Sequence, residues 1–239
     1  MSAVAWVAGG AGAIGGAIAR GLAADGFAIG IIDRDADGAK RAVATLEADH
    51  GVADAAPCDL TSIEGIRSAA AELTARLGEP HVLVHAAGIY PRAAVAEMDA
   101  DEWTAVLATN LTSAFVLSQA VLPSMLRRAD GRIVYVTSSL GTSGSERGAH
   151  YAASKAGLDA LMRSLSSEVA HHGIGVNCVA PGLTESPMMR RANSDAYVES
   201  VTAGLPGGRL GQPEDVVPLV RFLVGPGAHH VTGQVYALR

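Results

Sequence analysis

A tyrosine and a lysine four residues apart carry the most specific chemistry in this chain. Tyr151 and Lys155 fall on one face of the helix that we expect there. An ammonium group beside a phenol favours the phenolate, so we expect Lys155 to lower the pKa of Tyr151 from its usual value of about 10. Such a phenol can give a proton to a carbonyl or take one from an alcohol. Ser138, upstream, follows an apolar run typical of a strand and is the third candidate.

A glycine-rich segment near the start of the chain is suited to a dinucleotide. Residues 8–15 read Ala-Gly-Gly-Ala-Gly-Ala-Ile-Gly and join an expected strand to an expected helix. Glycines let the backbone approach a pyrophosphate, and the helix N-terminus supplies free N–H groups. Asp33 ends the second expected strand, where a carboxylate binds ribose hydroxyls and repels a 2′-phosphate. This favours NAD(H), but NADP(H) stays open because Arg34 could pair with a phosphate.

Composition excludes several classes of function. A net charge of -6 gives no electrostatic case for nucleic acid or an anionic membrane. We expect the two cysteines to be reduced thiols in the cytoplasm, because no secretory signature precedes them. No apolar run reaches the length of a membrane span, and the adjacent histidine pairs favour solvated side chains over a metal site. The expected partner is therefore a small-molecule substrate.

Short apolar runs alternate with helical periodicity along the whole chain. This alternation predicts an α/β fold: a doubly wound parallel sheet (Rossmann fold) of about seven strands with helices on both faces. We expect a single domain over residues 1–239 and a long helix over Asp101–Arg128 that Pro123 kinks or breaks. The expected strands are Ala3–Ala8, Ala28–Asp33, Val52–Cys58, His81–Ala86, Arg132–Thr137, Gly175–Val179 and Gln234–Leu238.

Residues 181–213 form a long stretch with few strand signals. The stretch is rich in Gly and Pro, with one or two short helices expected around Met188–Thr202. It follows the C-terminal end of a strand, where open α/β sheets bind ligands, and connections this long are usually functional. We interpret it as a substrate lid, with a packed surface excursion as the alternative.

The order of these motifs resembles the short-chain dehydrogenase/reductase family in its compact, single-domain branch. The resemblance runs from Val4 to Val235. It rests on the glycine loop, Cys58-Asp59-Leu60, His85-Ala86-Ala87-Gly88, Asn110, Ser138, Tyr151 with Lys155, Asn177-Cys178-Val179-Ala180-Pro181-Gly182 and Gly211-Gln212-Pro213-Glu214-Asp215. It implies an NAD(P)(H)-dependent oxidoreductase that interconverts a secondary alcohol and a ketone, as a homo-oligomer (tetramer or dimer).

The resemblance also implies a role for each residue of the site. Tyr151 would be the general acid/base, and Ser138 would orient the reacting oxygen. Lys155 would bond the nicotinamide ribose, while Asn110 would place a water that feeds protons to Lys155. The implied cofactor-binding residues are Gly9, Gly12, Ile14, Gly15, Asp33, Arg34, Asp59, Leu60, Ala87, Gly88, Tyr151, Lys155, Pro181, Gly182 and Ser186. The expected substrate-binding residues are Ser138, Tyr151, Tyr90, Leu183, Met188 and Met189.

The chain departs from the family pattern at several positions, including Thr184 where an aliphatic residue is usual. Ala8 and Ala13 replace the usual threonine and glycine of the loop. His85 and Ala86 stand where the family has two asparagines, and we interpret His85 as a core residue that holds neighbouring loops. The end of the chain lacks the usual Asp-Gly-Gly, a segment that often supports subunit contacts in the family.

Two other functions remain open. One is an NADPH-dependent 3-oxoacyl or polyketide ketoreductase, which would need basic residues near the site entrance. The candidates for that role are Arg127, Arg128, Arg190 and Arg191. The other is a non-catalytic dinucleotide-sensing protein, which would have no need of a proton relay.

Overall fold

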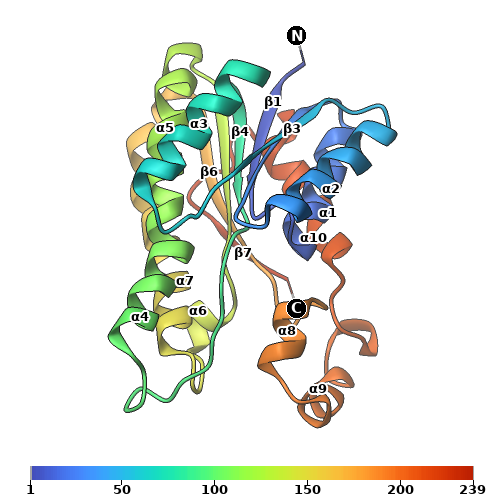
Figure 1. Ribbon diagram of the computed structural model, residues 1–239, viewed down its shortest axis with the longest axis vertical. Helices are drawn as coiled ribbons and strands as arrows, with labels where there is room; N and C mark the ends of the chain where they lie inside the picture. The colour runs from blue at the N-terminus through green and yellow to red at the C-terminus, as the bar shows by residue number, and fades with distance from the viewer. Residues whose placement is uncertain (1, 239) are drawn as a thin grey trace.

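A single seven-stranded parallel sheet forms the centre of the molecule (Figure 1). The computed structural model describes residues 2–238, so residues 1 and 239 of the expected domain lie outside the described residues. Across the sheet the strand order is β3-β2-β1-β4-β5-β6-β7. The strands are β1 Val4–Ala8, β2 Ala28–Asp33, β3 Ala53–Pro57, β4 Pro80–His85, β5 Gly131–Val136, β6 Ile174–Ala180 and β7 Val235–Ala237. The expected fold class is confirmed, and the order reverses between β1 and β4, where such sheets bind ligands.

Helices cover both faces of the sheet. In Figure 1, α3, α5 and α7 lie on one face, and α1, α2 and α10 lie on the other. The helices are α1 Ala13–Ala24, α2 Ala36–Ala48, α3 Ile63–Leu77, α4 Ala100–Leu107, α5 Ser113–Arg128, α6 Leu140–Ser143, α7 Ala149–Val169, α8 Pro187–Ala192, α9 Asp195–Thr202 and α10 Pro213–Val224. Because both faces are covered, the central strands are buried on both sides and consist of nearly continuous apolar runs.

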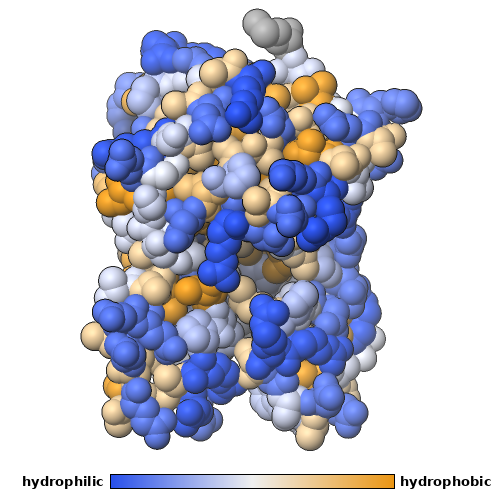
Figure 2. Space-filling model, in the orientation of Figure 1, coloured by the Kyte–Doolittle hydropathy of each residue, from blue (hydrophilic) through white to orange (hydrophobic). Residues whose placement is uncertain are grey.

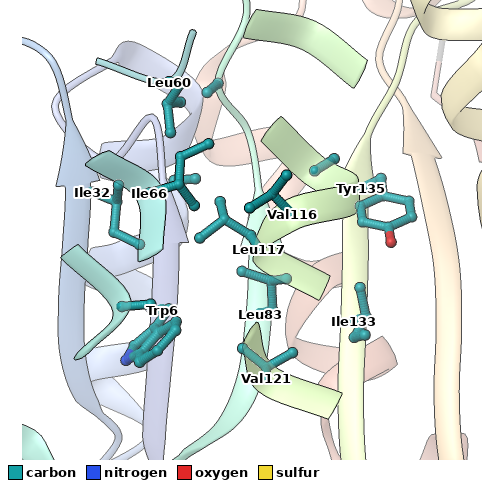
Figure 3. Packing of buried hydrophobic residues seen from close by; sticks show 14 of the residues in the cluster. Trp6, Ile32, Leu60, Ile66, Leu83, Val116, Leu117, Val121, Ile133 and Tyr135 are labelled. Carbon is teal, nitrogen blue, oxygen red and sulfur yellow. The ribbon is translucent and has the colours of Figure 1, made fainter. Parts of the chain in front are cut away.

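Alternation along each strand divides the core into two layers. Trp6 of β1 points into the layer beneath α3, α5 and α7, while its neighbour Val7 points into the layer beneath α1 and α10. Figure 3 shows the first layer, where Leu117 and Val121 of α5 lie against Leu83 of β4. This packing holds the strand ends, and therefore the loops that follow them, in fixed positions.

The expected long helix over Asp101–Arg128 is present, but it does not end at Pro123. Helix α4 passes through one π-helical turn, Ala108–Thr112, before continuing as α5. Pro123 lies inside α5 without ending it, so the expectation of a break there is wrong. The π turn contains the buried Asn110, and such turns are frequent at functional sites.

By length and composition, the combined helix Ala100–Arg128 could cross a membrane. The sequence analysis did not anticipate this, because no single apolar run there is long enough. In the structure, however, Val116, Leu117 and Val121 of this helix are buried against the sheet (Figure 3). The apolar composition of the helix is thus explained by its place in the core.

Residues 181–213 project beyond the C-terminal ends of the strands, across from α4 and α6 (Figure 1). They contain α8 and α9, close to the two short helices expected around Met188–Thr202. Thr184 pairs with Gly211 in a β-bridge, so the two ends of the excursion are joined. Figure 2 shows the surface hollowed between this projection and the one formed around α4, with apolar residues at the floor.

Candidate active site

The three residues expected to do the chemistry meet at the carboxyl end of β5. Ser138 follows this strand, while Tyr151 and Lys155 lie one turn apart at the start of α7. The buried Lys155 Nζ donates to the carbonyl oxygen of Val136 at 2.9 Å and lies 5.6 Å from the centre of the Tyr151 ring. The Ser138 hydroxyl is near enough to the Tyr151 phenol to lower its pKa. A phenol, a hydroxyl and an amine thus face one another at the edge where ligands bind.

Burial is the largest influence on the pKa values of Tyr151 and Lys155. It raises the pKa of Tyr151 to about 12, against the opposing effect of the Ser138 hydroxyl. It also lowers the pKa of Lys155 to about 8. The expectation that Lys155 lowers the pKa of Tyr151 is therefore wrong for the protein alone, because loss of water from the phenol outweighs the attraction of an ammonium 5.6 Å from the ring.

Tyr90 forms a wall beside Tyr151. The two rings are 4.2 Å apart between centres and tilted by 35°, an offset arrangement that aromatic pairs favour. The Tyr90 hydroxyl is held by a hydrogen bond to Ser145 Oγ. Gly148 makes this packing possible, because a Cβ there would lie 2.6 Å from the Tyr90 ring. Tyr90 therefore lies directly against the Tyr151 ring.

Asn110 connects the π turn to the loop after β4. Its Oδ1 accepts from the Ile89 N–H at 2.8 Å, and its Nδ2 donates to the Ile89 carbonyl at 3.1 Å. Nδ2 also donates to Ser154 Oγ at 3.0 Å. The side chain is fully buried, so all of its polar atoms are committed to fixing the relative positions of β4, the π turn and α7.

The expected core role of His85 is confirmed. Its ring is fully buried at the end of β4, and Nε2 lies 2.7 Å from Ser113 Oγ at the start of α5. Burial lowers the pKa of His85 to about 3, so the ring is neutral at ordinary pH. Its bond to Ser113 ties the end of β4 to the start of α5.

The turn between β1 and α1 fits a pyrophosphate. Gly9 has φ +81°, and a Cβ there would lie 2.6 Å from the Ala87 nitrogen. A Cβ on Gly15 would lie 2.1 Å from the Gly9 oxygen, so both positions require glycine. Gly12 caps α1 without a side-chain hydrogen bond, and the first turn of α1 has no acidic residue. Its free N–H groups and positive potential are therefore available to an anion. Ile14 lies half-buried in that first turn.

Asp33 at the end of β2 borders this turn. Its Oδ2 accepts from Ala11 N and its Oδ1 accepts from Asp35 N, both at 3.1 Å. A carboxylate has about four acceptor positions, so it can still bind ribose hydroxyls. Nearby, hydrogen bonds from Thr61 lower the pKa of Asp59, with a smaller contribution from the charge of Arg34.

The loops after β3, β4 and β6 place the other expected cofactor residues. Leu60 and Ala87 are buried, and Pro181 is buried beside the half-buried Gly182. A Cβ on Gly88 would lie 3.4 Å from Asn110 Oδ1 and 3.5 Å from Lys155 Nζ, so glycine keeps the space between these two groups open.

The expected site residues in the excursion do not all lie in the same surroundings. Ser186 Oγ accepts from Met189 N at 3.1 Å and so caps α8. The Met189 side chain packs with Val198 and Leu210 in a small apolar cluster internal to this segment. Leu183 packs against the same cluster, and Met188 is half-buried.

Sequence reasoning missed two polar residues, His150 and Glu102, that lie behind Tyr151 on α7 and α4. His150, beside Tyr151, is fully buried and pairs with Glu102 of α4. The sequence did offer one sign of this contact, because His150 and Ser154 are four residues apart and fall on one face of α7. Only the structure, however, shows that α4 packs against that face.

Comparison with known proteins assigns the family. Residues 9–238 match a family described as enoyl-(acyl carrier protein) reductase. The 3-oxoacyl-(acyl-carrier-protein) reductase FabG of Pseudomonas aeruginosa is 37% identical over 230 residues, covering 96% of this chain and 93% of the relative. The chain belongs to the short-chain dehydrogenase/reductase family. FabG of Escherichia coli is likewise 37% identical, covering 97% of this chain and 93% of its own.

Solved structures of this reductase family agree. A crystal structure of a variant actinorhodin polyketide ketoreductase with NADPH has a TM-score of 0.95 and 36% identity. The match covers 99% of this chain and 95% of the ketoreductase. The protein is an NAD(P)-dependent oxidoreductase of the short-chain dehydrogenase/reductase type, which acts on the alcohol–ketone pair.

The buried amine predicts how stability depends on pH. Between about pH 8 and the ordinary value of 10.5, unfolded chains bind a proton that folded Lys155 has lost, so stability rises with pH over that range. We expect wild type to gain stability relative to Lys155→Met between pH 8 and 10, measured by denaturant unfolding at each pH. Parallel stability curves for the two proteins would contradict the depressed pKa.

Proposed function

We propose that Tyr151 is the general acid/base of a ketone reductase or secondary-alcohol dehydrogenase. The observation that carries this is the meeting of Ser138, Tyr151 and Lys155 beside a turn that fits a dinucleotide. When bound, a nicotinamide cofactor supplies or accepts the hydride. In reduction, Tyr151 donates its proton to the carbonyl oxygen while Ser138 hydrogen-bonds that oxygen. In oxidation, the same phenol takes the proton of the alcohol.

Lys155 resupplies the proton in this scheme, and Asn110 would hold a water that feeds protons to it. Lys155 bonds the cofactor ribose, and its pKa of about 8 lets it hold or release a proton near neutral pH. Gly88 leaves space between Lys155 Nζ and Asn110 Oδ1. A water in that space would link the amine to the buried amide and to the Ile89 carbonyl.

Removal of the Tyr151 hydroxyl tests the proposal. We expect Tyr151→Phe to lower kcat by about 10²- to 10⁴-fold, because general acid–base catalysis contributes that much. Cofactor affinity, measured by fluorescence titration with NADH and NADPH, should change little. Tyr236→Phe on β7 is the matched control and should keep wild-type turnover. A Tyr151→Phe enzyme with near wild-type kcat would remove Tyr151 from the mechanism.

We propose further that Asp33 makes NAD(H) the preferred cofactor. Support comes from its carboxylate at the end of β2 and from the lack of any basic residue in the glycine loop, residues 8–15. The actinorhodin ketoreductase structure with NADPH favours the opposite preference, for which Arg34 is the candidate phosphate partner.

Asp33→Ala separates these alternatives. We expect it to weaken NAD(H) binding by on the order of 1.5–3 kcal/mol, the value of a hydrogen bond to a charged group, and to relieve repulsion of NADP(H). The kcat/KM values with each cofactor measure the change, and Arg34→Ala is the paired variant. Better wild-type turnover with NADPH, lost in Arg34→Ala, would assign the choice to Arg34 instead.

A 3-oxoacyl or polyketide ketoreductase is the second candidate function, favoured by the FabG and actinorhodin similarities. The expected basic entrance receives little support. Arg127 and Arg128 bond to Glu79 and the Pro80 carbonyl, at the opposite edge of the sheet from the site. In the excursion, Arg190 pairs with Glu185. Turnover of 3-oxoacyl thioesters, compared with that of simple ketones and secondary alcohols, discriminates between the two functions.

We also propose that residues 181–213 are a substrate lid. The β-bridge of Thr184 with Gly211 marks its base. Arg92 donates to the Ala192 carbonyl of α8 and to the Glu146 carbonyl in the loop before α7, so it links the two segments. Closure over the site would exclude water. Hydrogen exchange in the lid should slow when NADH and a substrate analogue are added together.

The two neighbouring methionines of α8 provide a matched pair. We expect Met188→Ala to raise KM or change substrate preference, since Met188 is the half-buried one. Met189→Ala should instead loosen the lid, because it opens a cavity against Val198 and Leu210. Steady-state kinetics on a substrate panel and exchange rates measure the two effects. Equal kinetics for wild type and Met188→Ala would place substrate choice near Tyr90.

Two properties of the whole protein complete the proposal. We propose a cytoplasmic location, supported by Cys58 and Cys178 being free, buried thiols. We propose a homo-oligomer, supported by the exposed Trp103 and Phe115 on the helix Ala100–Arg128. Light scattering of the purified protein measures its mass in solution.

A further inference from the structure

Both main-chain polar groups of Tyr151 are hydrogen-bonded to neighbouring side chains of α7. The Tyr151 N–H donates to His150 Nδ1 at 2.8 Å. The Tyr151 carbonyl accepts from Ser154 Oγ at 2.7 Å. The backbone of the proposed acid/base is therefore held from both sides.

Each of these side chains is held in turn by the long helix that carries the π turn. His150 Nε2 lies 3.2 Å from Glu102 Oε1 of α4, and Ser154 Oγ accepts from Asn110 Nδ2 at 3.0 Å. Two cross-links therefore join this helix to the first turns of α7. One of them contains Asn110, a residue of the proposed relay, and the other contains only Glu102 and His150.

The hydrogen bonds determine the tautomer of His150. Nδ1 accepts the Tyr151 N–H, so this nitrogen carries no proton. Nε2 therefore carries the hydrogen and donates it to the Glu102 carboxylate. The imidazole is fully buried, whereas the Glu102 side chain is 35% exposed and keeps its charge in contact with water. Glu102 thus selects the form of His150 that can accept from Tyr151.

The start of α7 has no other side-chain cap. Gly148 at the N-cap makes no side-chain hydrogen bond, and Arg147 before it has φ +55°, a conformation that favours glycine. Because the first N–H groups of a helix have no partner within the helix, the His150 ring satisfies one of them. That group belongs to Tyr151 itself.

We propose that Glu102 and His150 are a positioning pair for Tyr151. His150 anchors the Tyr151 main chain, and Glu102 orients His150. The pair ties the helix that carries Asn110 to the helix that carries Tyr151 and Lys155. This inference rests on the proposed role of Tyr151, and neither member of the pair touches the reacting atoms.

Substitution of each member tests the pair. We expect His150→Leu and Glu102→Ala each to lower kcat by about ten- to a hundredfold, the cost of a small misplacement of a catalytic group. KM for the cofactor should stay within about twofold of wild type, since the glycine turn is untouched. Glu102→Gln keeps an oxygen that accepts from Nε2 and should retain most of the wild-type kcat. Asp101→Ala, an exposed carboxylate beside Glu102, is the control and should leave kcat unchanged.

Combined variants distinguish positioning from general stability. In the His150→Leu background, Glu102→Ala should change kcat by less than about twofold, because Glu102 acts through His150. In the Tyr151→Phe background, His150→Leu should likewise leave the residual rate unchanged, since no phenol remains to be positioned. Additive losses in either background would overturn the inference.

Folding and the proposed function are checked separately. If His150→Leu does not fold, Glu102→Ala decides the question, because Glu102 is partly exposed. A folded Glu102→Ala enzyme that binds cofactor and keeps its kcat would overturn the pair while leaving Tyr151 in place. An active Tyr151→Phe enzyme would instead overturn the proposed mechanism.

Discussion

The burial of one ammonium group is the constraint on which the site depends. Lys155 is carried out of water by α7 and keeps a hydrogen bond to the Val136 carbonyl at the end of β5. Burial lowers its pKa to about 8, which turns a permanently charged side chain into one that can exchange a proton near neutral pH. The same loss of water raises the pKa of Tyr151, so the phenol keeps its proton until a further positive charge or a reacting oxygen is present.

The supports of this cluster lie in the sheet and in one long helix. Strand β5 provides the carbonyl that holds Lys155, and its neighbour β4 ends at His85, which bonds to the start of α5. The π turn between α4 and α5 directs Asn110 toward the loop after β4 and toward α7. With glycine at position 88, the space between Asn110 and Lys155 stays open. A rigid core on both faces of the sheet is what makes these distances reproducible.

Much of the fold could be predicted because its signals are local. Strand β2 has the bounds expected for it, Ala28–Asp33, since a strand buried on both faces is a continuous apolar run between turn residues. The expected break at Pro123 is absent because α5 continues through Pro123, while the π turn earlier in the helix has no glycine or proline to mark it. Met189 was grouped with Met188, although only packing distinguishes an inward side chain from its neighbour.

The sequence by itself determined the chemistry available to this protein, because residue types and short spacings specify it. Tyr151 and Lys155 share a helix face at any depth in the molecule, and a glycine turn between strand and helix suits a pyrophosphate wherever it lies. Only the tertiary structure decided how that chemistry is tuned. The pKa values depend on how much water each group loses, and the contact of Glu102 with His150 depends on two helices distant in the sequence. Desolvation and long-range contact are properties of packing, which no short stretch of the chain encodes.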